Sequence, residues 1–136
     1  MSTRLKEKQE KLEKLIAKLA EEASKGKPIV VEGKKDQEAL EELGVRGEFI
    51  TVKTGGKSFL EVAAEIQEKG VGSLMLLLDF DRRGKEGNAR LKRELERARI
   101  KVDTRFWLEL QALAGREIQC IESLPAYLET LQQKIA

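Results

Sequence analysis

The sequence predicts an α/β fold, with a mainly parallel sheet of four strands and helices on both faces. Three observations predict it. Short β-branched or apolar runs alternate with helical patterns along the chain, which is the order of elements in α/β layer folds. The run "LMLLL" at residues 74–78 is apolar at every position, as expected of a strand buried on both sides in a parallel sheet. Right-handed crossovers between parallel strands then place helices on both faces.

The spacing of apolar residues marks the helices. The first is expected at residues 3–24, where leucine and isoleucine recur mostly every three or four residues until Gly26 and Pro28 end the pattern. Ser58 can cap a later helix, and Pro125 suits the first turn of the last one. The remaining helices are expected at residues 34–44, 59–70, 87–99, 105–114 and 123–134.

Four short runs between these helices predict the strands. They are rich in β-branched or apolar residues, which suit a buried, pleated surface. They lie at residues 28–33, 47–52, 71–79 and 100–104. The 136 residues fit one domain. Within it we expect an N-terminal helical extension at 1–27, a core at 28–105, and a C-terminal helical segment at 106–136 packed on the same domain.

The composition excludes several kinds of chemistry. No histidine is present, so Ser-His-Asp catalysis, Cys-His catalysis and a histidine-ligated zinc site are excluded. The one cysteine, Cys120, cannot form an internal disulfide, which fits a reducing cytosol. A catalytic metal would therefore bind to carboxylates and water, which favours magnesium or manganese. Charged residues form 37% of the chain, a bias typical of proteins from hot-growing organisms.

The sequence shows no signal peptide, and no apolar run approaches the roughly 18 residues of a membrane span. We therefore expect a cytoplasmic protein without a membrane partner. The net charge of +2 is unevenly distributed: residues 29–81 carry six basic and eleven acidic side chains, whereas residues 82–105 carry ten basic and four acidic ones. The basic segment suits a phosphate-bearing partner, although a solvated helix face would have the same composition.

Acidic residues follow two of the predicted strands. Glu32 ends the first strand, and Asp79 and Asp81 end the third. The working site of an open α/β sheet lies outside the carboxyl ends of its strands. Asp79 and Asp81 are two residues apart, so in extended backbone their side chains point the same way. They suit Mg²⁺ or Mn²⁺, whereas Glu32 could complete the metal site or act as a general acid or base if its pKa is raised.

Basic residues and glycines lie close to these acids. Gly33 and Gly84 each follow one of the acidic positions and would allow a tight turn and a close approach of the backbone to a ligand. The basic side chains that we expect to contact phosphate are those of Lys34, Lys35, Lys57, Arg82, Arg83 and Lys85. The buried strand would thus hold two acids for a metal, and the cations would hold the anionic substrate of that metal.

An Asp-x-Asp pair alone could merely cap and turn a βα loop, but the glutamate upstream makes the pattern more specific. A strand ending in "EGxxD", followed by a strand ending in "DxDxxG", resembles the Toprim domain of type I and II topoisomerases, DnaG-type primases, OLD-type nucleases and RecR-type repair proteins. The resemblance covers roughly residues 28–105 and is carried by "IVVEGKKDQEAL" and "LMLLLDFDRRG". The whole chain is most similar to small stand-alone archaeal Toprim proteins, which are often grouped with the bacterial nuclease that matures 5S ribosomal RNA.

The resemblance implies the Rossmann-like Toprim fold, magnesium bound by Asp79 and Asp81, and Glu32 as general acid or base. The tyrosine module of a topoisomerase and the zinc- and helicase-binding parts of a primase are absent from the sequence. We therefore expect a metal-dependent nuclease that acts on RNA or DNA. A non-catalytic nucleic-acid-binding module in a repair or RNA-processing complex is the alternative. A phosphate-handling enzyme with a small substrate is a third interpretation.

Four other features allow more than one interpretation. "TVKTGGKS" ends like a P-loop, but Thr51 occupies the position at which that motif requires glycine, so we interpret it as a βα loop. Phe106 and Trp107 could stack on bases, but we expect them to pack in the core, and we expect Cys120 to be a small buried residue. The helix at residues 3–24 could cover the sheet, form a homodimer or clamp nucleic acid.

Overall fold

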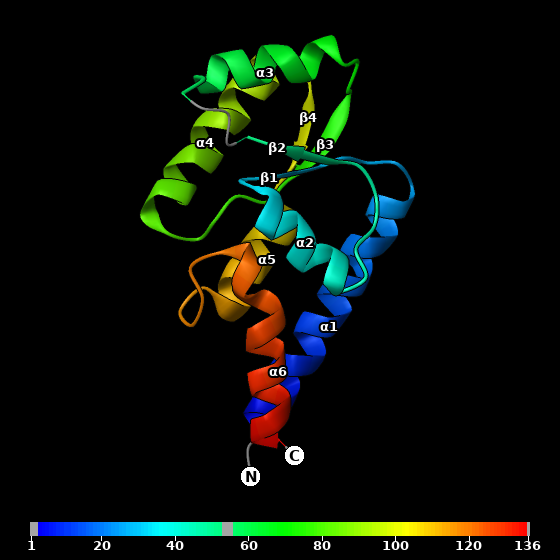
Figure 1. Cartoon of the computed structure of the whole chain (residues 1–136), viewed down its shortest axis with the longest axis vertical. Coiled ribbons are helices and arrows are strands. Elements are labelled where there is room, and N and C mark those ends of the chain that lie inside the picture. The colour runs from blue at the N-terminus through cyan, green and yellow to red at the C-terminus, as the bar shows by residue number, and fades with distance from the viewer. Residues whose placement is uncertain (1–2, 53–55, 136) are drawn as a thin grey trace.

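The computed structural model describes residues 3–52 and 56–135, and its centre is a sheet of four parallel strands in the order β2-β1-β3-β4 (Figure 1). The strands lie within their predicted ranges but are shorter than predicted, so Glu32 and Asp79 follow their strands and do not form the last strand residues. The strands are β1 (Ile29–Val31), β2 (Phe49–Thr51), β3 (Ser73–Leu76) and β4 (Lys101–Asp103). The predicted α/β fold with a parallel sheet is confirmed.

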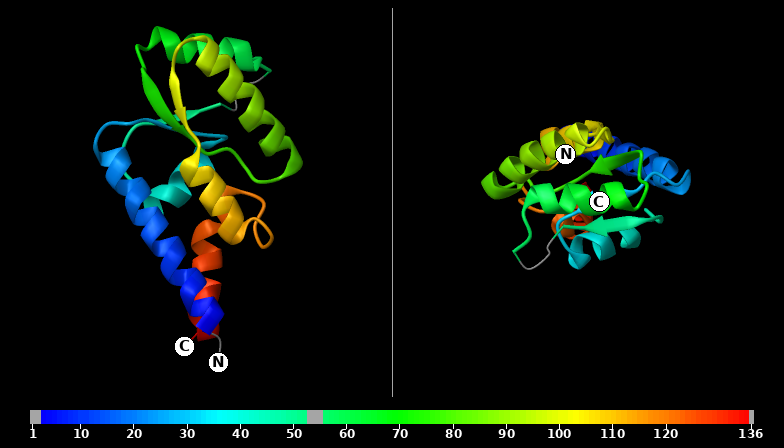
Figure 2. Two further views of the ribbon diagram at one scale, coloured as in Figure 1. Left: turned by 180° about the vertical axis from the view of Figure 1, so that it is seen from behind. Right: turned by 90° about the horizontal axis from the view of Figure 1, so that it is seen from above.

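In the described ranges, six α-helices and one short 3₁₀ helix surround the sheet. They are α1 (Thr3–Ser24), α2 (Lys34–Glu42), α3 (Phe59–Glu68), α4 (Arg82–Arg97), α5 (Arg105–Ala114), η1 (Ile121–Ser123) and α6 (Leu124–Ile135). Helices α3 and α4 cover one face of the sheet, and α1, α2, α5 and α6 pack on the other (Figure 2). This arrangement is the predicted one, with helices on both faces.

Two hydrophobic cores result from the alternation of side chains along the strands. In β1, Ile29 and Val31 pack with the α1, α5 and α6 layer, whereas Val30 packs with the α3 and α4 layer. Strand β3 divides in the same way, with Met75 in the first core and Leu76 in the second. Because the central strands are buried on both sides, they form a rigid support for the residues that follow them.

Helix α1 covers the first of these faces. Its buried side chains recur at helical spacing and pack against α5 and α6: Leu12, Leu15, Ile16, Leu19 and Ala23. The start of α1 and the end of α6 lie together at the end of the molecule that is farthest from the sheet (Figure 1). Of the roles considered for α1, the structure thus shows that it covers the sheet. The formation of a homodimer stays a prediction. No helix in the described ranges is long and apolar enough to cross a membrane, and the cytoplasmic location also stays a prediction.

The start of α4 differs from the prediction. A helix was expected at residues 87–99, but α4 begins at Arg82. Asp81 caps it by accepting a hydrogen bond from the Gly84 amide at 2.7 Å. Gly84 and Gly87, which suggest a loop by composition, are instead buried helical positions. The basic residues that follow Asp81 are therefore held on the first turn of a helix.

Several smaller predictions can also be compared with the structure. Ser58 caps α3 together with Glu61, as predicted. Phe106 and Trp107 are buried, which confirms core packing. Cys120 is half-buried, so its predicted full burial is wrong: it lies in the loop before η1, where the chain is only partly covered. In the "TGGKS" loop, residues 54–58, positions 54 and 55 lie outside the described residues.

Candidate active site

Glu32 and Asp79 come together because they follow neighbouring parallel strands. Strand β1 pairs with β3, with Val30 opposite Leu76, and the Leu77 amide donates to the Val30 carbonyl at 2.8 Å. Glu32 comes directly after β1, and Asp79 lies three residues beyond β3. The two half-buried carboxyl groups lie within hydrogen-bonding reach of one another. The convergence of these acids at the carboxyl edge of the sheet agrees with the expectation from the sequence.

A buried phenylalanine separates the two aspartates. Phe80 is 3% exposed, lies 6.1 Å from the ring of Trp107, and donates its amide to the Gln119 carbonyl at 2.8 Å. Because Phe80 points into the core, its neighbours Asp79 and Asp81 are left half-buried at the edge, near enough to repel one another electrostatically. One core residue thus keeps both acids on the outer side.

The pKa of Asp79 is raised to about 7. Burial of the carboxyl group is the largest cause, followed by the hydrogen bond and the charge of Glu32, and the charge of Asp81 adds to it. The Ile121 amide, which donates to Asp79 Oδ1 at 3.3 Å, acts in the opposite direction. Near neutral pH Asp79 is therefore only partly ionised unless a cation compensates the negative charge.

The donor set fits a hard divalent cation. A backbone amide holds Oδ1 of each aspartate, from Ile121 to Asp79 and from Gly84 to Asp81. In the described part of the chain, no backbone amide donates to either Oδ2 atom. No group of three or more Asp, Glu or Cys side chains among the described residues lies close enough to hold a metal alone. Water and substrate oxygens would complete the shell, which is how Mg²⁺ is usually bound.

A fourth acid, Asp36, was not predicted as a site residue. It is only 7% exposed and accepts hydrogen bonds from the Gly33 amide at 3.1 Å and from the Glu122 amide at 3.0 Å. Burial raises its pKa, and the nearby charge of Asp79 raises it further. The signal in the sequence was its position in "EGxxD", in the first turn of a helix, where acids stabilise the helix end.

The two glycines of the pattern have different roles. A Cβ atom at Gly84 would lie 2.3 Å from the Asp79 carbonyl oxygen, so only glycine lets the first turn of α4 contact the Asp79 backbone. Gly33 is the extended N-cap of α2, and a Cβ there would meet only Asp36 Oδ2, at 3.9 Å. Close packing therefore explains Gly84, whereas the space around Gly33 would admit a side chain.

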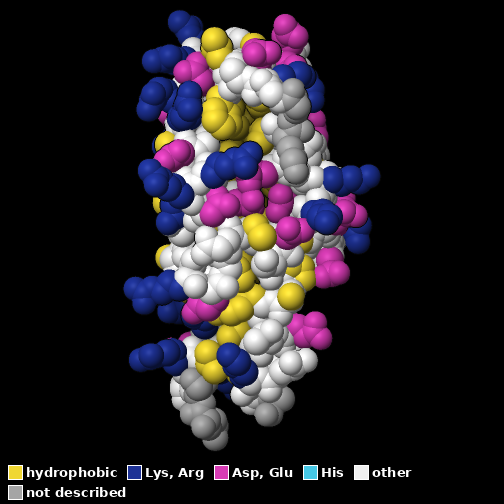
Figure 3. Space-filling model, turned by 60° about the vertical axis from the view of Figure 1, so that its left-hand side comes forward, with side chains coloured by type: hydrophobic (Ala, Val, Ile, Leu, Met, Phe, Trp, Pro, Cys, Tyr) yellow, Lys and Arg dark blue, Asp and Glu magenta, His cyan; other side chains and the backbone are white. Residues whose placement is uncertain are grey.

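The predicted phosphate-contacting residues are exposed and lie on α4, on α2 and in the loop before α3. Arg82, Arg83 and Lys85 are on the first turn of α4, and Arg82 forms an ion pair with Glu86 at 3.3 Å. Lys34 and Lys35 begin α2, and Lys57 forms an ion pair with Glu65. Figure 3 shows acidic side chains gathered in the middle of one face of the molecule, with Lys and Arg side chains around them.

Comparisons with known proteins agree with this arrangement. The Toprim domain model matches residues 27–105. A UPF0292 protein of Methanocaldococcus jannaschii, MJ1624, is 42% identical over 120 residues, covering 88% of this chain and 91% of that protein. A UPF0292 protein of Thermococcus onnurineus is 38% identical over 114 residues, covering 84% and 80%.

A solved structure of a protein from Aquifex aeolicus has the same fold. It superimposes with a TM-score of 0.65 at 29% sequence identity, and the match covers 81% of this chain and 94% of that one. The match to the family model includes the two strands that precede the acids. The chain belongs to the Toprim domain family, together with the small archaeal UPF0292 proteins that it is similar to.

Proposed function

We propose that this protein is a nuclease that hydrolyses phosphodiester bonds of RNA or DNA with a bound Mg²⁺ or Mn²⁺. One observation carries the proposal: Glu32, Asp79 and Asp81 converge at the carboxyl edge of the sheet, beside a helix whose first turn is basic. Acids of this kind hold a metal, and basic residues at the same edge suit the phosphates of a nucleic acid.

Asp79 and Asp81 would hold the metal. When bound, the metal stabilises the negative charge that develops on the phosphate in the transition state. The backbone amides of Ile121 and Gly84 orient the two carboxylates. Both side chains are therefore already ordered when the metal binds. Both interactions depend on the fold alone and would be present before substrate arrives.

Glu32 would move the proton. In hydrolysis the water oxygen forms a bond to phosphorus, the bond from phosphorus to the leaving sugar oxygen breaks, and the proton of the water passes to the Glu32 carboxylate. Glu32 then gives this proton to the leaving oxygen, so its carboxylate ends as it began. The proximity of Asp79 supports this role, because the Asp79 carboxyl group lies within hydrogen-bonding reach of Glu32 and, with a pKa of about 7, can both hold and release a proton near neutral pH.

The test is incubation of the protein with end-labelled RNA and DNA in Mg²⁺, in Mn²⁺ and in a chelator. We expect cleavage with either metal and none with the chelator. Glu32→Gln should abolish most of the cleavage, whereas Glu13→Gln, an exposed glutamate on α1, should leave it unchanged. Absence of cleavage with binding retained would refute the nuclease and leave a non-catalytic binding module.

A further inference from the structure

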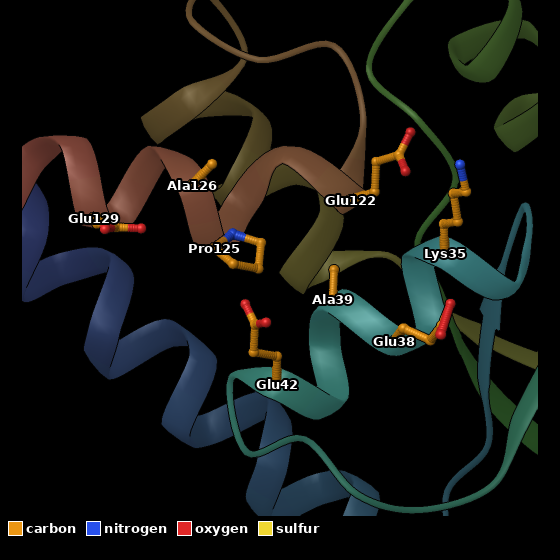
Figure 4. A pocket seen from close by; sticks show the side chains of 8 residues that line it. All are labelled: Lys35, Glu38, Ala39, Glu42, Glu122, Pro125, Ala126 and Glu129. Carbon is orange, nitrogen blue, oxygen red and sulfur yellow. The ribbon is translucent and has the colours of Figure 1, made fainter.

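The two sides of the candidate site carry opposite charge. On one side, α4 has seven basic and three acidic side chains from Arg82 to Arg97. On the other side, a groove of about 450 Å³ runs between α2 and α6 (Figure 4). Four of the residues that line this acidic groove are glutamates and one is a lysine: Glu38, Glu42, Glu122, Glu129 and Lys35.

The acidic groove begins directly at the site. The Glu122 amide donates to Asp36 Oδ1 at 3.0 Å, and the adjacent amide of Ile121 donates to Asp79 Oδ1 at 3.3 Å. Lys35 and Glu122 lie near one another at one end of the groove, and Glu129 lies at the other end, on α6 (Figure 4). A chain leaving the site in this direction would pass over glutamates on α2 and α6.

Helix α4 begins at the site, on the side away from the acidic groove. Asp81 is its N-cap, and the exposed side chains of Arg82, Arg83 and Lys85 follow within one turn. Arg90 and Arg93 extend the row of exposed cations along the helix. The acids of the site therefore lie between a basic helix and an acidic groove.

This asymmetry decides how a polynucleotide can lie. A duplex strand carries one phosphate in about 3.4 Å of its axis. Charges interact over roughly 8 Å at physiological ionic strength. A strand that continued through the site and across the groove would hold several phosphates close to several glutamates, which is unfavourable. A strand that stops at the site and extends only along α4 avoids this repulsion.

We infer that the site takes the end of a nucleic-acid strand, with the rest of the chain lying along α4 and no nucleotides crossing the acidic groove. This inference rests on the proposed function, because it assigns the substrate class of the same site. Among the described residues that line the groove, Lys35 is the one cation, and it lies beside Glu122 at the end of the groove that is next to the site.

The experiment compares a linear single strand with its covalently closed circle, in RNA and in DNA. Binding is measured by fluorescence anisotropy in Mn²⁺ with the Glu32→Gln variant, which preserves the substrate during the measurement. We expect the linear strand to bind about tenfold more tightly than the circle. The parent protein should cleave the linear strand and release labelled terminal nucleotides first. Equal binding and equal cleavage of circle and linear strand would overturn the inference.

Removing negative charge from the acidic groove tests whether these glutamates cause the preference for the linear strand. The triple variant Glu38→Gln, Glu42→Gln and Glu129→Gln removes three exposed charges from the groove and none from the site. It should bring the affinity for the circle to within about twofold of that for the linear strand.

The matched control removes the same amount of charge from α1, at Glu7, Glu10 and Glu13, which are also exposed. This control variant should raise the affinity for the linear strand and the affinity for the circle slightly and equally, so the preference for the linear strand persists. A groove variant that behaves like this control would contradict the inference.

The two proposals can fail separately. If the parent binds neither form of either nucleic acid, the proposed function fails, and the inference fails with it. If linear strand and circle are bound and cleaved alike, the nuclease stands and only the preference for strand ends is refuted.

Discussion

Asp79→Asn should stabilise the metal-free protein at alkaline pH, although it removes a residue of the proposed metal site. The parent carboxyl has a pKa of about 7 in the folded state. It has a pKa of about 3.9 when unfolded. Because folding raises this pKa, ionised Asp79 disfavours the folded state above pH 7, and the penalty declines as the pH falls toward 4. Asparagine has no charge. Its side-chain oxygen can still accept a hydrogen bond from the Ile121 amide, and its NH₂ group can donate a hydrogen bond to Glu32.

The size of the effect follows from the shift. Three pKa units correspond to about 4 kcal/mol if the group is fully shielded. Asp79 is only half-buried, so solvent screening reduces this to about 1–2 kcal/mol. In a chain of 136 residues, 1 kcal/mol changes the Tm by roughly 4 °C. We therefore expect the Tm of Asp79→Asn in chelator at pH 8 to exceed that of the parent by roughly 4–8 °C.

Thermal denaturation followed by circular dichroism measures this difference at pH 8 and at pH 5. The gain should shrink at pH 5, and Mn²⁺ should stabilise the parent but not the variant. Glu13→Gln, which removes an exposed charge from α1, is the control and should show little change at either pH. An Asp79→Asn protein that is no more stable than the parent at pH 8, or equally more stable at both pH values, would refute the reasoning.

Three further predictions concern single elements of the site. Gly84→Ala should lower the free energy of unfolding by about 1–3 kcal/mol in urea titrations, because its Cβ would lie 2.3 Å from the Asp79 carbonyl oxygen, and it should also weaken Mn²⁺ binding in calorimetry. Glu32→Gln should reduce the cleavage rate roughly 10²–10⁴-fold while the affinity for nucleic acid stays the same; full activity would exclude an acid–base role. Replacing the three cations at the start of α4 by alanine should weaken binding to all sequences and flatten the salt dependence by about 0.7–0.9 in log-log slope per lost phosphate contact. The three cations to be replaced are Arg82, Arg83 and Lys85. An unchanged salt dependence would mean that these side chains are only solvated and do not contact phosphate.

Local patterns of the sequence were sufficient for most elements. The predicted helix at residues 3–24 coincides with α1, since its leucine spacing reports directly which face is buried. The start of α4 could not be predicted, because Gly84 and Gly87 are unfavourable in an isolated helix. They are tolerated here because α4 packs against the Asp79 backbone and against the side chains of Phe59 and Leu78.

The sequence by itself determined the sheet and the acids at its edge. Two apolar runs, each followed by an acid, Glu32 or Asp79, are enough to predict both, because the carboxyl ends of parallel strands meet at one edge of the sheet. Only the tertiary structure decided that Asp36 joins them and that residues 119–122 return to hold Asp79 in place. It also decided that an acidic groove borders the site. The hydrogen bonds to Asp79 and Asp36 come from backbone amides that lie 42 and 86 residues away along the chain, and such contacts leave no periodicity or composition in the sequence from which they could be predicted.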